Sequence, residues 1–364
     1  MVIASAYREQ PSTQEAWKEV ITMRSPSRVA ILIFAVVVSV VAVVLTGYGT
    51  SAWAQPERVN FGLDWFVHGK HVMYYPAIGQ GIYQKYGLSV NMVRGFGSGD
   101  TIQKVDQKSF DVGFADMSTL VLLRAKGARV VEVGMIHHLM PHAIFFLKGS
   151  GIRTPKDLEG RTFSTPAGNA VWVLLPAFAK STGFDHTKIR HVPAEGAASN
   201  AAVLAGKVDA AGIFWTVYPT IAAEARKLGK ELGYFKYSDY GLDLYANGLI
   251  VREDLIREKP DLVQRFVRAT FEGVHWALKN PEQAFEIYMK QNPEHDREKA
   301  WGEWVTAIDM FGAVAKSART PLQLAWMDPA KVGKTVEIIG ELYKLESPVK
   351  PGEIYTNRFA EPLP

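Results

Sequence analysis

The pattern of apolar and polar positions at the start of the globular part predicts a strand, a helix and a second strand in succession. The first strand ends at Gly62-Leu63-Asp64-Trp65, so an acid and a large aromatic side chain stand at its tip. Apolar residues recur at helical spacing over 72–86, Gly87 ends the helix, and a second strand is expected over 89–93. This order is a βαβ unit, and such units place their strand tips at a ligand crevice.

Similar alternations continue along the chain. Strands are predicted at 111–116, 130–136, 143–148, 162–164, 189–192, 208–215 and 249–251, and helices at 120–125, 170–180, 199–205, 261–278, 282–291, 296–312 and 331–343, with one more ending near 108. The segments 109–114 and 207–214 share one design, because each follows a helix and delivers polar or aromatic groups at the end of a strand. We interpret them as parts of two α/β lobes that face one another. Chance similarity between short α/β segments is the alternative.

The predicted fold is therefore α/β, with two lobes that are each a mixed sheet flanked by helices. Residues 55–148 and 249–345 are assigned to lobe 1, 149–248 to lobe 2, and 346–364 to a C-terminal tail. The late helices have no strands left to build a third sheet, so we expect them to fold back onto lobe 1. The chain would then cross between the lobes near Lys148 and near Asn247.

The N-terminal 54 residues read as a secretory signal peptide. An apolar run over 29–45, broken only by Ser39, follows Arg24 and Arg28 and precedes Ala52-Trp53-Ala54, so cleavage is expected after Ala54. An uncleaved anchor is the alternative, since the run is long for a signal core. Met23 is a candidate true start, because Met1 would give an unusually long leader.

Composition limits the class of protein. The chain has 364 residues, 48% of them hydrophobic, which is enough for two cored domains. The net charge of +4 is spread along the chain without basic blocks, so no nucleic-acid partner is expected. There is no cysteine, and this leaves neither a disulfide nor a lipid-anchored N-terminus of the bacterial lipoprotein type. A monomeric protein of a bacterial periplasm fits best.

Asp64 and Trp65 are the first candidate binding residues. They suit a stacking platform beside a carboxylate that accepts hydrogen bonds from an amino group or a cation. The alternative is a core tryptophan and an aspartate that caps a turn. Tyr75 and His71 are added as pocket residues; His68 and His71 could share a metal, but no further ligands accompany them, so no metal is predicted.

Two glycine-containing turns precede predicted helices. Gly97 and Ser98 lie in the first turn, and Gly168 and Asn169 lie in the second. A helix N-terminus offers free N–H groups and the positive end of the helix dipole. Neither turn matches a nucleotide or dinucleotide motif, and ordinary strand-to-helix turns are the alternative.

The remaining candidates stand at other strand tips and in one loop: Asp116, Ser118, Glu195, Trp215 and Tyr218. They converge only if the two lobes close on a ligand; core or surface positions are the alternative. No nucleophile motif and no paired acid and base are evident, so no catalytic residue and no cofactor are predicted.

These features resemble the substrate-binding proteins of ABC importers, in the branch that groups thiamine-pyrimidine, nitrate, sulfonate and taurine binders (the NMT1/THI5-like or SsuA-like domain). The matching features are Leu63-Asp64-Trp65 with His71, Gly87-Leu88 with Val90, Gly97-Ser98, 111–116, Thr154-Pro155 with Asp157-Leu158 and Gly160, and 206–209. The resemblance implies the type II periplasmic binding protein fold, with two crossover strands and hinge closure on a ligand. It carries site roles to Asp64, Trp65 and His71, and also to Ser98, Asp116, Gly168 and Trp215. The pyrimidine binders tend to have Pro-Asn a residue after the tryptophan, where this chain has Phe66-Val67-His68, and this leaves the identity of the ligand open.

We therefore expect an exported solute-binding protein that delivers a small, flat, nitrogen-containing ligand, such as a thiamine-precursor pyrimidine, to an ABC permease in the inner membrane with its cytoplasmic ATPase. Asp64, Asp116 and Glu195 favour that ligand over a bare oxyanion. A sulfonate, nitrate or similar oxyanion is the second hypothesis, because of the two helix N-termini. A pyrimidine-synthesis enzyme on the same fold is the third, although the fungal enzymes of the family rely on a cysteine-rich motif. An anchored sensor lobe is the fourth.

Overall fold

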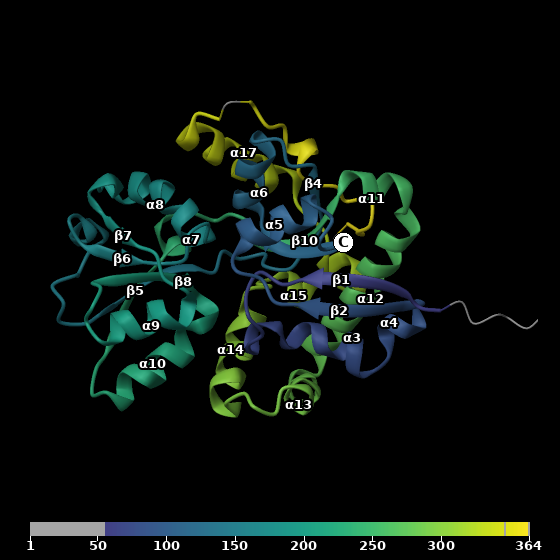
Figure 1. The fold of residues 1–364 in the computed structure, drawn as a ribbon, viewed down its shortest axis with the longest axis horizontal. Coiled ribbons are helices and arrows are strands. Elements are labelled where there is room, and N and C mark those ends of the chain that lie inside the picture. Colours follow the sequence, from purple (N-terminus) through teal and green to yellow (C-terminus); the bar gives the residue numbers. More distant parts are fainter. Residues whose placement is uncertain (1–54, 346, 363–364) are drawn as a thin grey trace, which may run out of the picture. The chain divides into compact units, whose positions relative to one another are not determined.

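The computed structural model describes residues 55–345 and 347–362, so the predicted signal peptide, its cleavage site and the candidate start at Met23 lie outside the described residues. Residues from Pro56 onward form one compact unit. Its described part contains two five-stranded sheets flanked by helices (Figure 1). None of the helices in this part is long and apolar enough to cross a membrane.

The first sheet has the strand order β2-β1-β3-β10-β4 and the second has the order β7-β6-β8-β5-β9. The strands of the first are β1 (Glu57–Gly62), β2 (Leu88–Val93), β3 (Val112–Asp116), β4 (Val130–Met135) and β10 (Asn247–Arg252). Those of the second are β5 (His142–Leu147), β6 (Thr162–Ser164), β7 (Arg190–Val192), β8 (Ala210–Phe214) and β9 (Leu232–Lys236).

Both sheets share one plan. In each, three strands run parallel, and a fourth pairs antiparallel with the third: β10 with β3, and β5 with β8. All residues of β3 and β4 are buried, as expected of strands covered on both faces. The predicted α/β fold of two mixed sheets is therefore confirmed. The sequence analysis missed β9.

The two sheets are joined by two connections. The chain moves from the first sheet to the second between β4 and β5, and it returns between β9 and β10. The strand expected at 143–148 thus belongs to the second sheet. The chain therefore crosses from the first sheet to the second before this strand, and not near Lys148 as predicted. The lobe boundaries drawn from the sequence remain a prediction.

Helices flank both sheets. With the first sheet go η1 (Gly69–Tyr74), α3 (Tyr75–Gly79), α4 (Ile82–Lys85), α5 (Ser98–Asp106), α6 (Met117–Ala125), α11 (Glu253–Glu258), α12 (Pro260–Lys279), α13 (Pro281–Gln291), α15 (Val314–Ser317) and α16 (Pro321–Leu324). With the second go η2 (Pro155–Leu158), α7 (Ala170–Val173), α8 (Leu175–Thr182), η3 (His186–Lys188), α9 (Gly196–Leu204), η4 (Trp215–Val217), α10 (Tyr218–Lys227) and η5 (Tyr237–Tyr240). The helix predicted over 72–86 is three short pieces, because Pro76 lies in the first turn of α3 and Gly81, with φ of 69°, interrupts the run before α4.

Two helices near the end of the chain contact helices that flank both sheets. α14 (Arg297–Asp309) packs against η1 and against α10, and α17 (Pro329–Tyr343) packs against α6 and α8. The Nζ atom of Lys180 in α8 lies 2.9 Å from Oε2 of Glu341 in α17, and the Tyr343 hydroxyl donates to the backbone oxygen of Val173. The fold-back of the late helices is therefore not confined to the first sheet.

The C-terminal segment docks on the edge of the first sheet. The Glu132 N–H donates to the Ile354 oxygen at 2.8 Å, and the Thr356 N–H donates to the Glu132 oxygen at 2.9 Å. Ile354 and Phe359 are buried. η6 (Pro351–Glu353) precedes these contacts, so the segment called a tail in the sequence analysis covers an edge strand that would otherwise be exposed.

Candidate functional site

A cavity of about 50 Å³ lies where segments that follow strands of both sheets meet. From the first-sheet side it is lined by Asp64, Trp65, Phe66, His68, Lys70, Gly97 and Ser98, and from the second by Pro166, Asn169, Ala170, Gly196, Asn200, Gly212, Ile213, Phe214 and Val217. Asp64, Trp65, Gly97, Ser98 and Asn169 are residues that the sequence analysis proposed for binding.

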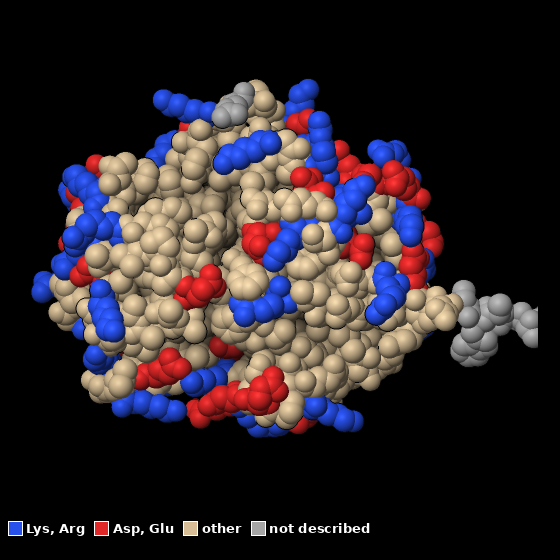
Figure 2. Space-filling model, in the orientation of Figure 1, with Lys and Arg blue, Asp and Glu red and all other residues tan. Residues whose placement is uncertain are grey.

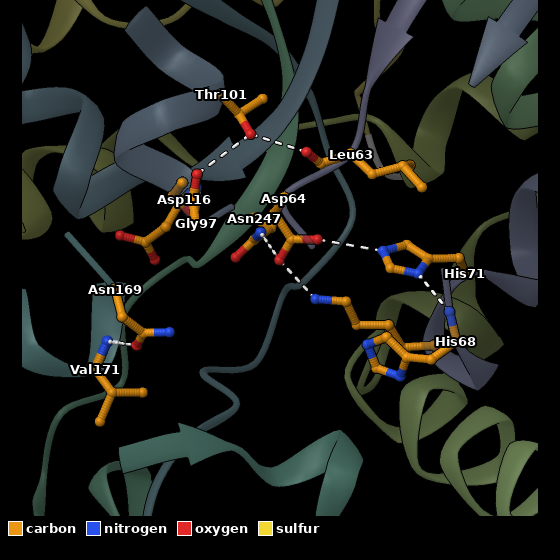
Figure 3. Close-up of polar contacts among 12 residues, drawn as sticks. Leu63, Asp64, His68, His71, Gly97, Thr101, Asp116, Asn169, Val171 and Asn247 are labelled. Carbon is orange, nitrogen blue, oxygen red and sulfur yellow. Dashed lines mark hydrogen bonds and ion pairs between the residues drawn. The ribbon is translucent and has the colours of Figure 1, made fainter. Parts of the chain in front are cut away.

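The tip of β1 is held against the loop that precedes α5. The Gly97 N–H donates to the backbone oxygen of Asp64 at 2.8 Å. The Thr101 hydroxyl donates to the backbone oxygen of Leu63 at 2.8 Å (Figure 3). Gly95 has to be a glycine, since a Cβ there would stand 2.0 Å from the Leu63 oxygen. These contacts fix the position of Asp64 and its neighbour Trp65 at the cavity.

Asp64 is the centre of a buried polar network (Figure 3). Its Oδ2 atom accepts from Lys70 Nζ at 2.5 Å and from Asn247 Nδ2 at 3.0 Å, and its Oδ1 atom lies 3.2 Å from His71 Nε2. Burial by itself would raise the pKa of Asp64, but the Lys70 ammonium and the bond with His71 hold that pKa well below its usual range. Asp64 is therefore an ionised carboxylate whose oxygens are occupied by the protein's own donors.

His71 lies behind Asp64 and does not line the cavity. The His68 N–H donates to its Nδ1 atom at 3.3 Å, so Nε2 carries the proton and donates to Asp64. Burial lowers the pKa of His71 to about 3, so the imidazole is neutral. Its role is to orient Asp64.

Trp65 reaches from the first-sheet side to the start of α9. Its indole is half-buried and lies on the backbone of Gly196. The tryptophan is therefore a wall of the cavity and not a core residue.

Lys70 is a charged lining residue that was not predicted from the sequence. It is 3% exposed, and its Nζ atom lies 5.0 Å from the centre of the Phe214 ring. A signal was present in the sequence, since Lys70 is a charged residue two positions before the apolar run 72–75.

Hydrogen-bond donors gather around the cavity. Ser98 begins α5, and its Oγ atom accepts the Asp116 N–H at 3.1 Å, which leaves the hydroxyl proton free to donate. Asn169 caps α7 through Oδ1, which accepts the Val171 N–H at 2.8 Å, so its amide protons remain available (Figure 3). Gly196 begins α9, and the first N–H groups of a helix have no partner within that helix.

Other predicted residues lie beside or away from the cavity. Gly168 and Glu195 directly precede lining residues, and Gly168 has a φ of 74°. Trp215 and Tyr218 stack on one another, with ring centres 4.4 Å apart. Tyr75 is buried in the first core, and its hydroxyl donates to Asn292 at 3.2 Å, because the short helix α3 turns this side chain toward α13.

Asp116 and Ser118 are also buried outside the lining. Asp116 caps α6 by accepting the Thr119 N–H at 2.9 Å. Its Oδ2 atom lies 3.6 Å from His142 Nε2, which is too long for a hydrogen bond. Burial raises the pKa of Asp116 to about 6 and lowers that of His142 to about 3, so the two side chains do not form an ion pair.

The chain is similar in sequence to several named proteins. The chain is 27% identical over 241 residues to the formylaminopyrimidine-binding protein of Halalkalibacterium halodurans, covering 65% of this chain and 72% of that protein. It is 29% identical over 249 residues to the riboflavin-binding protein RibY of Chloroflexus aurantiacus, covering 66% and 69%. It is also 22% identical over 313 residues to the 4-amino-5-hydroxymethyl-2-methylpyrimidine phosphate synthase of Legionella pneumophila, covering 85% and 94%.

The fold is shared with solved structures. The alkanesulfonate-binding protein SsuA from Xanthomonas axonopodis pv. citri, bound to MOPS, superposes with a TM-score of 0.64 at 15% identity, covering 83% of this chain and all of that chain. A family model described as NMT1/THI5 like matches residues 68–284, more than half of the chain. The chain therefore belongs to the NMT1/THI5-like family.

Proposed function

We propose that this protein is the extracytoplasmic solute-binding component of an ABC importer, and that it holds a small planar ligand between its two sheets. The observation that carries the proposal is the cavity itself, which takes its lining from both sheets and has the Trp65 indole as one wall. A flat ring can stack on an indole while its edge meets polar groups. The two named binding relatives support a ligand with a planar ring, since formylaminopyrimidines and riboflavin both contain planar heteroaromatic rings.

Binding requires the two sides of the cavity to move apart. Its volume of about 50 Å³ is well below the roughly 300–1,000 Å³ of pockets for drug-sized ligands. The two connections between the sheets, at 136–141 and 237–246, are the natural hinge, because hinges are a few residues at the ends of elements. A solute that entered the open form would be enclosed as the sides returned, and the closed form would be presented to the permease.

An anionic ligand is the second candidate. The starts of α5 and α9 face the cavity, and helix N-termini favour negative charge. The sulfonate-binding neighbour shows that this fold accommodates such a ligand. A pyrimidine-synthesis activity, as named for the Legionella relative, would be recognised by product formation from a bound ligand.

The proposal is tested by a thermal-shift screen of aminopyrimidines, flavins, planar acids, sulfonates and nitrate against the purified protein. A ligand at 100 times its Kd stabilises the folded state by about 2.7 kcal/mol. We expect a planar compound to raise Tm and Trp65→Ala to abolish that shift. Trp276→Ala is the matched control, because Trp276 is also a partly buried tryptophan but lies on α12, outside the lining. Equal ligand-induced shifts of Tm in the wild type and in Trp65→Ala would show that the indole takes no part in binding.

A further inference from the structure

Lys70 brings a buried positive charge to the cavity. An ammonium group has three N–H donors, and a buried one is costly unless these find acceptors. Among the described residues, Lys70 Nζ has one hydrogen-bond acceptor, Asp64 Oδ2 at 2.5 Å. Its other near neighbours are the faces of Phe214 and Phe114, with ring centres 5.0 and 5.8 Å away. The ammonium therefore has donor capacity left for a ligand.

Asp64 does not have matching capacity left. It accepts from Lys70, His71 and Asn247, three donors on two oxygens. A carboxylate has about four lone-pair sites, so about one of them remains for a ligand amino group, against two free N–H groups on Lys70. From the sequence, Asp64 was expected to accept hydrogen bonds from an amino group or a cation of the ligand. Its contacts in the structure suit it better to holding the Lys70 ammonium in place.

The carboxylate of Glu303, which lies outside the lining and contacts the lining residue His68, also accepts from the protein's own donors. Glu303 Oε2 lies 2.9 Å from His68 Nδ1 and accepts the Gly69 N–H at 2.8 Å, while Oε1 accepts from the Thr220 hydroxyl at 2.6 Å. The groups with unused capacity are thus mainly donors: the Lys70 ammonium, the Ser98 hydroxyl, the Asn169 amide and the first N–H groups of α5 and α9. Among the lining residues, Asn200 Oδ1 is a buried acceptor for which the described residues supply no donor. Outside the lining, Asp116 Oδ2 is another.

We infer that Lys70 is a specificity-determining residue and that it selects planar ligands bearing a carboxylate over their neutral analogues. The inference rests on the proposed function and narrows its ligand class to planar ring acids. The ligand ring stacks on Trp65, and its carboxylate takes the free N–H groups of Lys70. The starts of α5 and α9 add favourable potential for the same charge. A neutral amide in the same place would leave the ammonium without a charged partner on the ligand side.

Isothermal titration calorimetry with matched acid and amide pairs tests this inference. The probes are nicotinate and nicotinamide, benzoate and benzamide, and orotate and orotamide, because each pair keeps the ring and changes the charge. We expect at least one acid to bind the wild-type protein ten-fold or more tightly than its amide. In Lys70→Met that ratio should fall to near one.

Two further variants keep the test decisive. Asp64→Asn combined with Lys70→Met removes both charges and avoids an unpaired buried carboxylate, so it serves if the single variant does not fold. Lys331→Met is the matched control, because Lys331 is also a largely covered lysine paired with a carboxylate, Asp243 at 2.6 Å, but lies outside the lining. Its acid-to-amide ratio should equal that of the wild type.

The outcomes separate this inference from the proposed function. Planar rings that bind the wild type with no preference for the acid would overturn the role of Lys70 and leave the binding function in place. The same holds if the lysine variants weaken acid and amide equally, as a purely structural residue would. If no planar ring of either charge binds the wild type, both proposals fail.

Discussion

The indole of Trp65 rests directly on the backbone of Gly196, although 130 residues separate them in the chain. A Cβ atom at Gly196 would lie 2.4 Å from Cζ2 of Trp65 and 3.0 Å from its Nε1. The contact joins the tip of β1 in the first sheet to the first residue of α9 beside the second sheet. A glycine at this position is therefore what allows the aromatic wall to close over the cavity.

Gly196→Ala should weaken ligand binding by about ten-fold, a loss of about 1.4 kcal/mol. The new methyl group would push the half-buried indole out of its place, while Gly196 has no positive φ that would strain an alanine. Calorimetric titration with the best ligand of the screen measures the effect. Gly333→Ala in α17 is the control, because nothing lies within 4 Å of its added Cβ; it should stabilise the fold by up to about 1 kcal/mol without changing affinity. Unchanged affinity in Gly196→Ala would show that the contact does not shape the site.

Asp64→Asn should destabilise the fold by about 3–5 kcal/mol, because it leaves the buried Lys70 ammonium without its counter-charge. The double variant with Lys70→Met should recover much of this loss, so the two effects are not additive. Urea unfolding of the four proteins of the cycle provides the coupling energy. Glu341→Gln, which removes the exposed partner of Lys180, should change stability by no more than about 1 kcal/mol. A double variant as unstable as the sum of the singles would contradict the pairing.

His142 should make the protein less stable in acid. Burial lowers its pKa from 6.5 to about 3, so between these values the unfolded chain binds more protons than the folded one, and stability falls as pH is lowered through this window. His142→Phe keeps a ring against Phe214 and Tyr237 but cannot titrate. The free energy of unfolding measured between pH 4 and 6 should then vary less steeply, by up to about 1.4 kcal/mol per pH unit. An unaltered slope would mean that His142 takes up its proton in the folded state.

Asp116 should have the opposite effect on the pH dependence of stability. Burial raises its pKa from 3.8 to about 6, so in that window the folded state binds more protons, and this group favours folding as pH falls. Asp116→Asn can keep the cap of α6, since asparagine is also a good N-cap, but removes the titration. We expect the variant to lose stability more steeply than wild type between pH 6 and 4. A slope that becomes shallower would contradict this assignment.

Ile354→Ala should lower the free energy of unfolding by about 2–5 kcal/mol, as large-to-small changes at buried positions do. Ile354 holds the C-terminal segment on the edge of β4, where its backbone oxygen accepts the Glu132 N–H. Hydrogen exchange at the Glu132 and Thr356 amides should rise together with the loss of stability. Val305→Ala on the exposed face of α14 is the control and should have little effect. Unchanged exchange in Ile354→Ala would mean that the backbone contacts alone hold the segment.

The paired mixed sheets followed from the sequence because strand and helix signals are local. The strand predicted at 162–164 is β6 as observed, and the prediction that Gly97-Ser98 opens a helix matches α5. Periodicity, glycine stops and capping residues act within a few positions, so they can be read without knowing the rest of the fold. The sequence also pointed to Asp64 and Trp65, since the residues after a strand of a βαβ unit are directed to the crevice edge.

Only the tertiary structure decided which charges face the cavity. Lys70 and Tyr75 belong to one short stretch, yet the lysine lines the cavity and the tyrosine packs on α13. Asp64 is occupied because Asn247, from β10, arrives beside it. Contacts between residues more than a hundred positions apart depend on how distant elements of the chain are brought together, and no local pattern carries that information. The sequence by itself thus determined the class of fold and the edge at which we propose that a ligand binds, while long-range packing decided the chemistry of that edge.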